Sequence, residues 1–306
     1  RGAGGVFRYG VSAWMTARAP RYDPPMPMHT RTSARARMAA AVDSGVAGAE
    51  TTYDVPDSLN RGGHRFREER CVEPRPYTLA EVLAESCNVG TIQVAEDVGA
   101  DAIYDYLVAF GFDEPTGLDF PDEATGMFPE PDAWSGSTLA SMSLGQGIAI
   151  TTMQLLYAFN AIANDGLYVP PSLVSNVIDE EGVRHPVETG APRRVISAEA
   201  AEEVQGMLGG VVSGGTAAQA AIEGYEVAGK TGTARIPHPE GGYEWDDGYR
   251  HVVSFAGFLP ASDPQVSVLV MLDQPTSTYA ADTAAPAFAE VARWAVHQLG
   301  IPPVSE

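Results

Sequence analysis

The sequence predicts an α/β fold of the α+β type, in which an antiparallel sheet is flanked by helices. Two observations predict it. Apolar residues recur at helical spacing in several segments of the first two thirds of the chain, and the spacing changes to that of extended strands after about residue 212. One more helical segment follows the strands. The expected order is therefore helices, a meander of strands, and a helix that packs back on the sheet.

Capping residues mark the helices. Thr78 is followed three residues later by Glu81, which is the pattern of a capping box. Asp101 is expected to cap another helix, and Gly111 stands where a C′ glycine belongs. Irregular structure is expected in two segments. Residues 1–33 contain several prolines and show no sustained period, and residues 113–150 are rich in proline and glycine and show no period. The expected helices cover about residues 34–45, a short segment from 78, 89–98, 101–110, 151–165, 197–212 and 285–299.

Three runs near the C-terminus read as strands, at residues 227–235, 252–259 and 266–273. A short proline-bounded connection, Pro260–Pro264, joins the last two. Such a connection fits a hairpin, so these two strands are expected to be antiparallel.

Composition limits the classes of function. The chain has 306 residues with 44% apolar residues, which is enough to bury a core, and a formal net charge of −21. This charge excludes a nucleic-acid binder that neutralises phosphates, and it argues against a polybasic grip on anionic lipid. No signal peptide opens the chain, no run reaches the ~18 apolar residues of a membrane span, and position 1 is Arg, so the start is expected to be a cut or a fragment end.

Cysteine and histidine give no metal site. Cys71 and Cys87 could pair, but unpaired buried cysteines are the favoured interpretation. The six histidines are scattered without ligand spacing, and no cofactor is expected.

One motif points to a nucleotide. The segment Gly224–Thr231 satisfies the P-loop pattern G-x4-G-K-[ST], and the apolar run that ends at Asp273 could supply an acid for magnesium. A P-loop must lead into a helix, yet the residues after Thr231 are β-branched and are interrupted by Pro237 and Pro239. A P-loop NTPase therefore remains only a distant alternative.

The same residues also fit a strand at the edge of a cleft. Lys230, Thr231 and Thr233 are interleaved with glycine, and Lys230 is the only lysine in a chain that otherwise uses arginine. Glycine lets a substrate backbone approach closely, and a peptide can add to such an edge as a further strand. An ammonium group and hydroxyls on this edge can then bind a carboxylate.

At this strand the sequence resembles a known family. Lys230-Thr231-Gly232 matches the K-T-G motif of penicillin-binding proteins and serine β-lactamases, and Ser86-Cys87-Asn88 matches the companion S-x-N motif between two helices. Further segments resemble the class B penicillin-binding proteins, especially the division-type peptidoglycan D,D-transpeptidases: Thr52–Asp57, Ser86–Thr91, Phe110–Pro121, Leu144–Gly147, Gly214–Ala217 and Ser254–Pro260. The resemblance covers about residues 38–300.

The resemblance implies the penicillin-binding-protein/β-lactamase-like transpeptidase fold, with an all-helical lobe that carries the S-x-N motif and with the first strands missing. It implies acyl transfer from D-Ala–D-Ala stem peptides, with β-lactams as substrate mimics. Ser86 would relay a proton, Asn88 would orient the substrate amide, and Lys230 would supply positive charge. Thr231, Gly232 and Thr233 would bind the substrate, with the two hydroxyls on its terminal carboxylate and the Thr233 N–H as an oxyanion donor.

The family's nucleophile motif, S-x-x-K, occurs nowhere in the sequence, because the single lysine belongs to K-T-G. Gapless counting from Thr51–Asp57 places the expected lysine at about Ala34 and the serine at about Arg31. A small slip could bring Thr32 or Ser33 to the helix start, but neither gains a base, since arginine stays protonated. The nucleophile is unknown, and the chain is expected to be catalytically incomplete.

Three explanations fit this absence. The chain could be a pseudoenzyme that binds stem peptides or division proteins, a fragment, or a sequence whose first 37 residues are read in the wrong frame. A damaged start is favoured, because residues 1–37 hold seven arginines and one acid and end close to where the resemblance begins. We therefore expect an atypical segment 1–37, a transpeptidase domain 38–301 and a tail 302–306. The parent protein is expected to be membrane-anchored and to act outside the cytoplasm.

Overall fold

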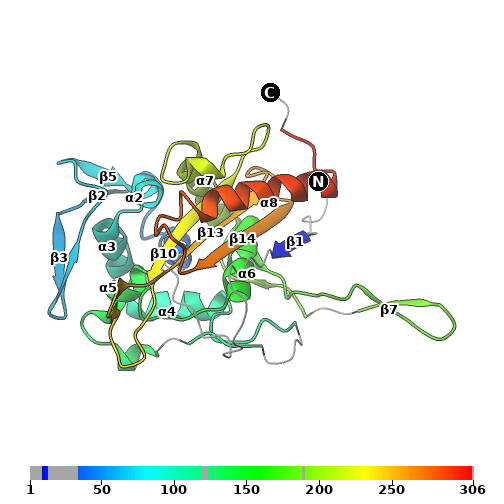
Figure 1. The fold of residues 1–306 in the computed structure, drawn as a ribbon, viewed down its shortest axis with the longest axis horizontal. Helices are drawn as coiled ribbons and strands as arrows, with labels where there is room; N and C mark the ends of the chain where they lie inside the picture. Colours follow the sequence, from blue (N-terminus) through cyan, green and yellow to red (C-terminus); the bar gives the residue numbers. More distant parts are fainter. Residues whose placement is uncertain (1–8, 13–33, 119–122, 128, 188–189, 305–306) are drawn as a thin grey trace.

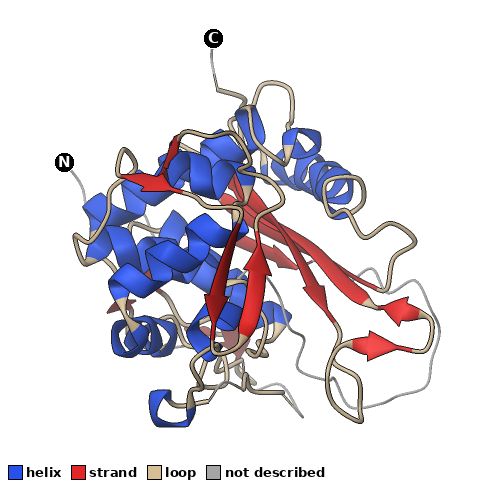
Figure 2. Ribbon diagram, turned by 90° about the vertical axis from the view of Figure 1, so that its left-hand side faces the viewer, coloured by secondary structure: helices blue, strands red, loops and turns tan. Residues whose placement is uncertain are grey.

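A computed structural model describes residues 9–12, 34–118, 123–127, 129–187 and 190–304. Its centre is a four-stranded sheet with helices packed against it (Figures 1 and 2). The strand order is β1-β14-β13-β10, formed by β1 (Tyr9–Ser12), β10 (Ala228–Arg235), β13 (His251–Leu259) and β14 (Val266–Asp273). The predicted antiparallel meander is confirmed, since β10 pairs with β13 and β13 pairs with β14 in antiparallel register.

The expectation of irregular structure over residues 1–33 is wrong for β1, which pairs in parallel with β14. The strand has four residues, Tyr-Gly-Val-Ser, and so short a run shows no alternation in the sequence. Its pairing is created by β14, which is distant in the chain.

The helices agree with the predicted segments except in the region 113–150. They are α1 (Ala34–Asp43), α2 (Leu79–Glu85), α3 (Asn88–Val98), α4 (Ala100–Ala109), α5 (Thr138–Ser143), α6 (Thr152–Ala163), α7 (Ala198–Ser213) and α8 (Ala284–Leu299). Helix α5 lies in the stretch predicted to be irregular, and its six residues are too few to display a helical period. Among the described residues, no helix has the length and apolar composition that crossing a membrane requires.

Two predicted helix caps can be compared with the structure, those of α2 and α4. The capping box at α2 is confirmed, because the Thr78 hydroxyl accepts the Glu81 N–H at 3.1 Å and the Glu81 carboxylate accepts the Thr78 N–H at 2.8 Å. The expected cap of α4 is wrong. Gly99, with φ of 90°, both ends α3 and precedes α4, and Asp101 lies in the first turn, where a carboxylate is favoured by the helix dipole.

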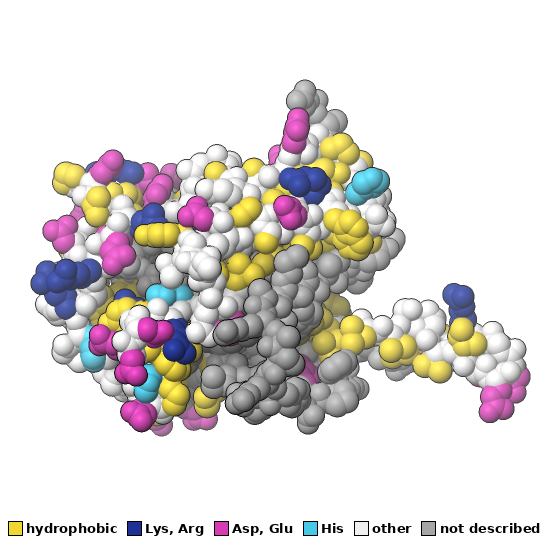
Figure 3. Space-filling model, in the orientation of Figure 1, with side chains coloured by type: hydrophobic (Ala, Val, Ile, Leu, Met, Phe, Trp, Pro, Cys, Tyr) yellow, Lys and Arg dark blue, Asp and Glu magenta, His cyan; other side chains and the backbone are white. Residues whose placement is uncertain are grey.

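Short strand pairs occupy the periphery. They are β2 (Thr52–Asp54) with β5 (Pro76–Thr78), β3 (Ser58–Arg61) with β4 (His64–Arg67), β6 (Leu167–Tyr168) with β9 (Arg193–Arg194), β7 (Asn176–Ile178) with β8 (Arg184–Pro186), and β11 (Glu244–Trp245) with β12 (Gly248–Tyr249). The β7–β8 hairpin extends away from the body as an arm (Figures 1 and 3). Its exposed apolar side chains include Leu173, Val177 and Ile178.

Asp43 joins three helices. Its carboxylate, at the end of α1, accepts hydrogen bonds of 2.7 Å from the Tyr106 hydroxyl of α4 and from the backbone N–H of Ser197, the N-cap of α7. Burial raises the pKa of Asp43, but these hydrogen bonds and the charge of Arg194 outweigh it and leave the pKa below its ordinary value. The helical lobe and α7 are thereby fixed to one another.

Close packing fixes the position of β10 next to β13 in the sheet. Gly229 of β10 faces Gly257 of β13 in the ladder, and the Phe255 ring fills the space beside both. A Cβ built at Gly229 would lie 2.5 Å from the Phe255 ring. That ring is held in turn by an edge-to-face contact with Phe288 of α8, with centroids 4.5 Å apart. Glycine at position 229 is therefore a packing requirement.

We expect Gly229→Ala to lower the free energy of unfolding by about 1–3 kcal/mol, as overpacking of a filled core does. The measurement is urea denaturation followed by circular dichroism. Gly206→Ala is the matched control, because Gly206 is exposed in the middle of α7 and no atom lies within 4 Å of its added Cβ. There alanine should stabilise by about 0.5–1 kcal/mol. Equal effects of the two substitutions would contradict the packing argument.

Candidate active site

Strand β10 carries the predicted substrate-binding residues. Side chains alternate between the two faces of a strand, so Thr231 and Thr233 share one face and Lys230 points to the other. The two threonines are half-buried, whereas Lys230 is only 6% exposed. The Lys230 ammonium still reaches the edge, since Nζ lies 3.4 Å from the Thr231 hydroxyl oxygen. The ammonium and the Thr231 hydroxyl therefore meet at one border of the strand, and the Thr233 hydroxyl donates to the Thr278 carbonyl at 3.4 Å.

The P-loop interpretation is wrong. Gly229, Lys230 and Thr231 lie inside β10, which continues as a strand to Arg235. A phosphate-binding loop needs a helix that starts at the lysine and points its N–H groups at the anion. Here the N–H and C=O groups of Lys230 and Thr231 belong to a strand paired with β13.

Ser86 and Asn88 lie in the turn between α2 and α3. Ser86 is the C-cap of α2 and has a left-handed backbone with φ of 63° and ψ of 44°, while Asn88 is the first residue of α3. A left-handed conformation at a non-glycine residue costs of order 1–3 kcal/mol and persists only where its surroundings enforce it. Such residues cluster at functional sites, which makes this turn a candidate part of a site.

Glu68 was missed by the sequence analysis. It is a buried acid, 8% exposed, and its Oε2 accepts the backbone N–H of Val89 at 2.7 Å. Its Oε1 accepts the N–H groups of Glu69 at 2.9 Å and Arg70 at 3.0 Å, with the Cys71 N–H at 3.4 Å. Glu68 thereby caps α3 from a distant loop. The only sequence signal was an acid in a polar stretch, which is ordinarily a solvated position.

The favoured interpretation of unpaired cysteines is wrong. Cys71 and Cys87 form a disulfide, with Cα atoms 5.5 Å apart, and both residues are buried. Cys87 lies between Ser86 and Asn88, so the bond ties the middle of the S-x-N turn to the loop of residues 67–71, which contains Glu68. Spacing alone could not reveal this, because the two loops are brought together by the packing of β5, α2 and α3.

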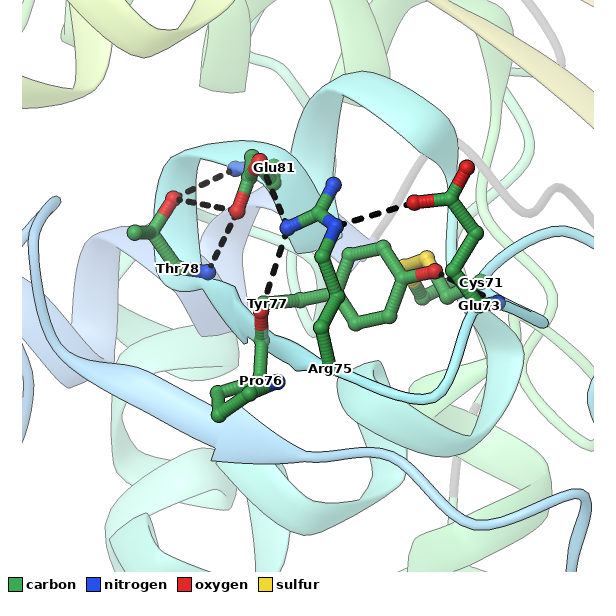
Figure 4. Close-up of polar contacts among 8 residues, drawn as sticks. Cys71, Glu73, Arg75, Pro76, Tyr77, Thr78 and Glu81 are labelled. Carbon is green, nitrogen blue, oxygen red and sulfur yellow. Dashed lines mark hydrogen bonds and ion pairs between the residues drawn. A yellow bond between two sulfur atoms is a disulfide. The ribbon is translucent and has the colours of Figure 1, made fainter.

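The segment that leads into α2 is also fixed by polar contacts (Figure 4). Arg75 forms ion pairs with Glu73 at 3.1 Å and with Glu81 at 2.9 Å, and its guanidinium stacks 4.2 Å from the centroid of the Tyr77 ring. The Tyr77 hydroxyl accepts the Glu73 N–H at 2.9 Å. Thr78 and Glu81 then cap α2, so the N-terminal end of this short helix is held by polar contacts.

Helix α7 connects the turn to the strand, because it packs against both α2 and β10. The segment that follows it bonds directly to α2. Both the N–H and the hydroxyl of Thr216 donate to the Ala84 carbonyl, at 3.2 and 3.1 Å. A Cβ at the adjacent Gly215 would lie 2.8 Å from that same oxygen, so glycine is needed for this approach. The β10 strand is the edge of the sheet drawn toward α2 and α3 in Figure 1.

Residues 236–249 connect β10 to β13 and contain the β11–β12 hairpin. Aromatic contacts fix it. Trp245 lies between His238, with ring centroids 4.7 Å apart, and Arg250, whose guanidinium is 3.9 Å from the Trp245 centroid. Arg235, the last residue of β10, stacks at 4.0 Å on Tyr249.

The region expected to hold a nucleophile is described only in part. Arg31, Thr32 and Ser33 lie outside the described residues, and Ala34 begins α1. Within α1, Arg37 is fully buried and its Nη2 donates to the Ser143 carbonyl at 3.1 Å. Burial lowers the pKa of Arg37 to about 9, so the guanidinium keeps its proton at neutral pH. It therefore cannot replace the base of an S-x-x-K motif.

In the described part of the chain, no group of three His, Cys, Asp or Glu side chains could hold a metal ion. The predicted site residues of the turn and the strand supply hydroxyls, an amide and an ammonium. Such groups suit an anionic or peptide ligand.

Reduction of the Cys71–Cys87 disulfide should lower the free energy of unfolding by about 3 kcal/mol, because the bond closes a loop with a separation of 16 residues. Urea denaturation with and without reductant measures this. The double variant Cys71→Ser/Cys87→Ser should match the reduced protein and should not respond to reductant. Identical stability of the oxidised and reduced protein would contradict the assignment.

Comparison with known proteins agrees with this geometry. The family model described as the penicillin binding protein transpeptidase domain matches residues 36–293. PbpB of Mycolicibacterium smegmatis is 37% identical over 276 residues, which span 86% of this chain and 42% of that protein. PbpB of Mycobacterium tuberculosis is 35% identical over 277 residues, with 86% and 40% covered. The chain thus spans about two fifths of the length of these relatives.

Solved structures give the same result. Penicillin-binding protein 3 of Mycobacterium tuberculosis in complex with ampicillin superposes with a TM-score of 0.84 at 33% identity, covering 90% of this chain and 63% of that one. The complex with aztreonam gives a TM-score of 0.82 at 34% identity, with the same coverage. Because the family model matches most of the chain and the fold agrees, this chain belongs to the penicillin-binding protein transpeptidase domain family.

Proposed function

We propose that this chain is the substrate-binding core of a peptidoglycan transpeptidase and that it binds peptides ending in D-Ala–D-Ala and their β-lactam mimics. One observation at the edge strand β10 carries the proposal: Lys230 Nζ lies 3.4 Å from the Thr231 hydroxyl oxygen. Thr233, two residues further along the same strand, is half-buried. An ammonium and two hydroxyls are suitable partners for a terminal carboxylate. The similar penicillin-binding protein 3 structures are complexes with ampicillin and aztreonam, which supports β-lactam binding by this chain.

The two halves of the site have separate tasks in this proposal. Thr231 and Thr233 bind the terminal carboxylate, and the Thr233 N–H donates to the carbonyl oxygen under attack. Asn88, at the start of α3, orients the substrate amide, and Ser86 relays a proton to the leaving amine. Lys230 supplies positive charge beside Ser86 and so lowers the free-energy cost of negative charge there.

The proposal assigns no nucleophile and no base for the acyl-transfer step. The sequence has one lysine, Lys230, so no serine stands three residues before a lysine. Arg37 stays protonated at neutral pH and cannot accept the proton of a serine hydroxyl. We therefore propose that the chain, as it stands, binds substrate without forming an acyl-enzyme. A pseudoenzyme and a chain with a misread or truncated start both give this behaviour.

The site of action follows from the disulfide. Disulfides form and persist in oxidising compartments, and Cys71–Cys87 supports placement outside the cytoplasm. We propose that the parent protein acts at the outer face of the cell membrane, where peptidoglycan is cross-linked. Division proteins are its proposed partners.

Incubation with benzylpenicillin should leave the intact mass of the chain unchanged. The reason is that acylation needs a serine activated by a neutral base. Electrospray mass spectrometry of the intact chain measures this, and a catalytically complete relative serves as the positive control. A stoichiometric mass increase would overturn the claim that the chain is catalytically incomplete.

Reversible binding is the complementary test. A labelled pentapeptide ending in D-Ala–D-Ala should bind, and Lys230→Ala should weaken it about tenfold or more, since hydrogen bonds to charged groups contribute about 1.5–3 kcal/mol. Arg235→Ala is the matched control, because it removes one positive charge from the exposed end of the same strand. Absence of binding at millimolar peptide, or equal loss in both variants, would contradict the proposed site.

A further inference from the structure

We propose that Glu68 is the positioning residue of the Ser86–Asn88 turn, and that the Glu68 loop, residues 67–71, fastened by the Cys71–Cys87 disulfide, holds this turn in its binding geometry. The inference rests on the proposed function for its ligand and deepens it. It concerns a residue that touches no substrate and acts through Asn88 and Ser86.

The first argument is the place of the carboxylate. The first N–H groups of a helix have no partner within the helix. Cys87, the N-cap of α3, offers no side-chain hydrogen bond to them. The Glu68 carboxylate supplies the missing acceptor to Val89 at 2.7 Å and stands at the positive end of the helix dipole. The start of α3, where Asn88 lies, is thus capped from another loop.

The second argument is the number of ties between the two segments. Besides the Glu68–Val89 bond, the Asn88 side-chain amide donates to the Arg67 carbonyl at 3.4 Å, and Cys71 is bonded to Cys87. The loop therefore contacts three successive residues that follow Ser86. One of these contacts involves the Asn88 amide itself, so the loop fixes the direction of the group that is to meet the substrate.

The third argument is the strained serine. Ser86 has a left-handed backbone that a free chain would leave for a more favourable conformation. On its α2 side it is held by the N–H groups of Ser86 and Cys87, which donate to Leu83 and Val82 at 3.3 and 3.0 Å. On its α3 side the Glu68 loop is the support. Loss of that support should release the turn while the core beneath it stays packed.

Glutamine is the informative replacement. Glu68 uses both oxygens, one for Val89 and one for the N–H groups of the loop. Glutamine keeps the size but replaces one acceptor by a donor, so it can serve only one side. Glu68→Asp, which is shorter by one methylene, should likewise fail to span both. Glu69→Gln is the matched control, because Glu69 is the neighbouring acid and is exposed.

Amide hydrogen exchange of Val89 tests the contact directly, because this N–H has no partner within α3. In the intact oxidised chain, Glu68→Gln should speed its exchange about tenfold or more, with little change in the strands of the central sheet. Glu69→Gln should leave it unchanged. Equal Val89 exchange in the wild type and Glu68→Gln, or a uniform acceleration over the whole chain, would overturn the proposal. If Glu68→Gln does not fold, Glu68→Asp takes its place.

Peptide binding tests whether the contact positions the site. For the labelled D-Ala–D-Ala pentapeptide, Glu68→Gln should raise the Kd about tenfold, and reduction of the disulfide should raise it as well. On the background of the double variant Ser86→Ala/Asn88→Ala, Glu68→Gln should add little, because Glu68 acts through these two residues. Additive effects would mark a merely structural residue and overturn the proposal. If the wild type binds no peptide, the proposed function fails, and the exchange of Val89 alone decides the role of Glu68.

Discussion

The ladder between β10 and β13 is the constraint on which the candidate site depends. Eight residues of β10, Ala228 to Arg235, pair without a break with Phe258 to His251. This register sends Thr231 and Thr233 to one face and Lys230 to the other. The contact of Gly229 with the Phe255 ring fixes the strand at this register, since a shift by one residue would place a side chain where the ring lies. A packing contact in the core thereby decides which groups reach the border of the sheet.

The helical lobe holds the strained turn at Ser86, between α2 and α3. The left-handed Ser86 is bracketed by a short helix capped at its start and by a longer helix whose start is capped by Glu68. The Arg75 cluster and the Cys71–Cys87 disulfide join these parts into one unit. Backbone strain is tolerated where the surroundings over-determine the conformation, and at Ser86 both charge and a covalent bond contribute.

The sequence contains the K-T-G and S-x-N motifs, to which we assign binding and orientation of the substrate, and it contains no S-x-x-K motif. These two functions are physically separable, because carboxylate binding requires donors and positive charge, whereas acyl transfer requires a deprotonated base beside a hydroxyl. The single lysine, Lys230, belongs to K-T-G, the motif that we propose for the first function. Arg37, buried in α1 against the Ser143 carbonyl, keeps its proton at neutral pH and cannot serve as the base.

Period, caps and motifs are local in the chain, so the meander of β10, β13 and β14, the capping box of α2 and the residues of both family motifs could be predicted from the sequence. It could not reveal β1, α5 or the start of α4, whose segments are too short or too ambiguous for a period. The role of Glu68 and the Cys71–Cys87 bond were decided only by tertiary structure. Glu68 is separated from Val89 by 21 residues, and a buried carboxylate is recognisable only when the N–H groups that compensate its burial have been brought to it.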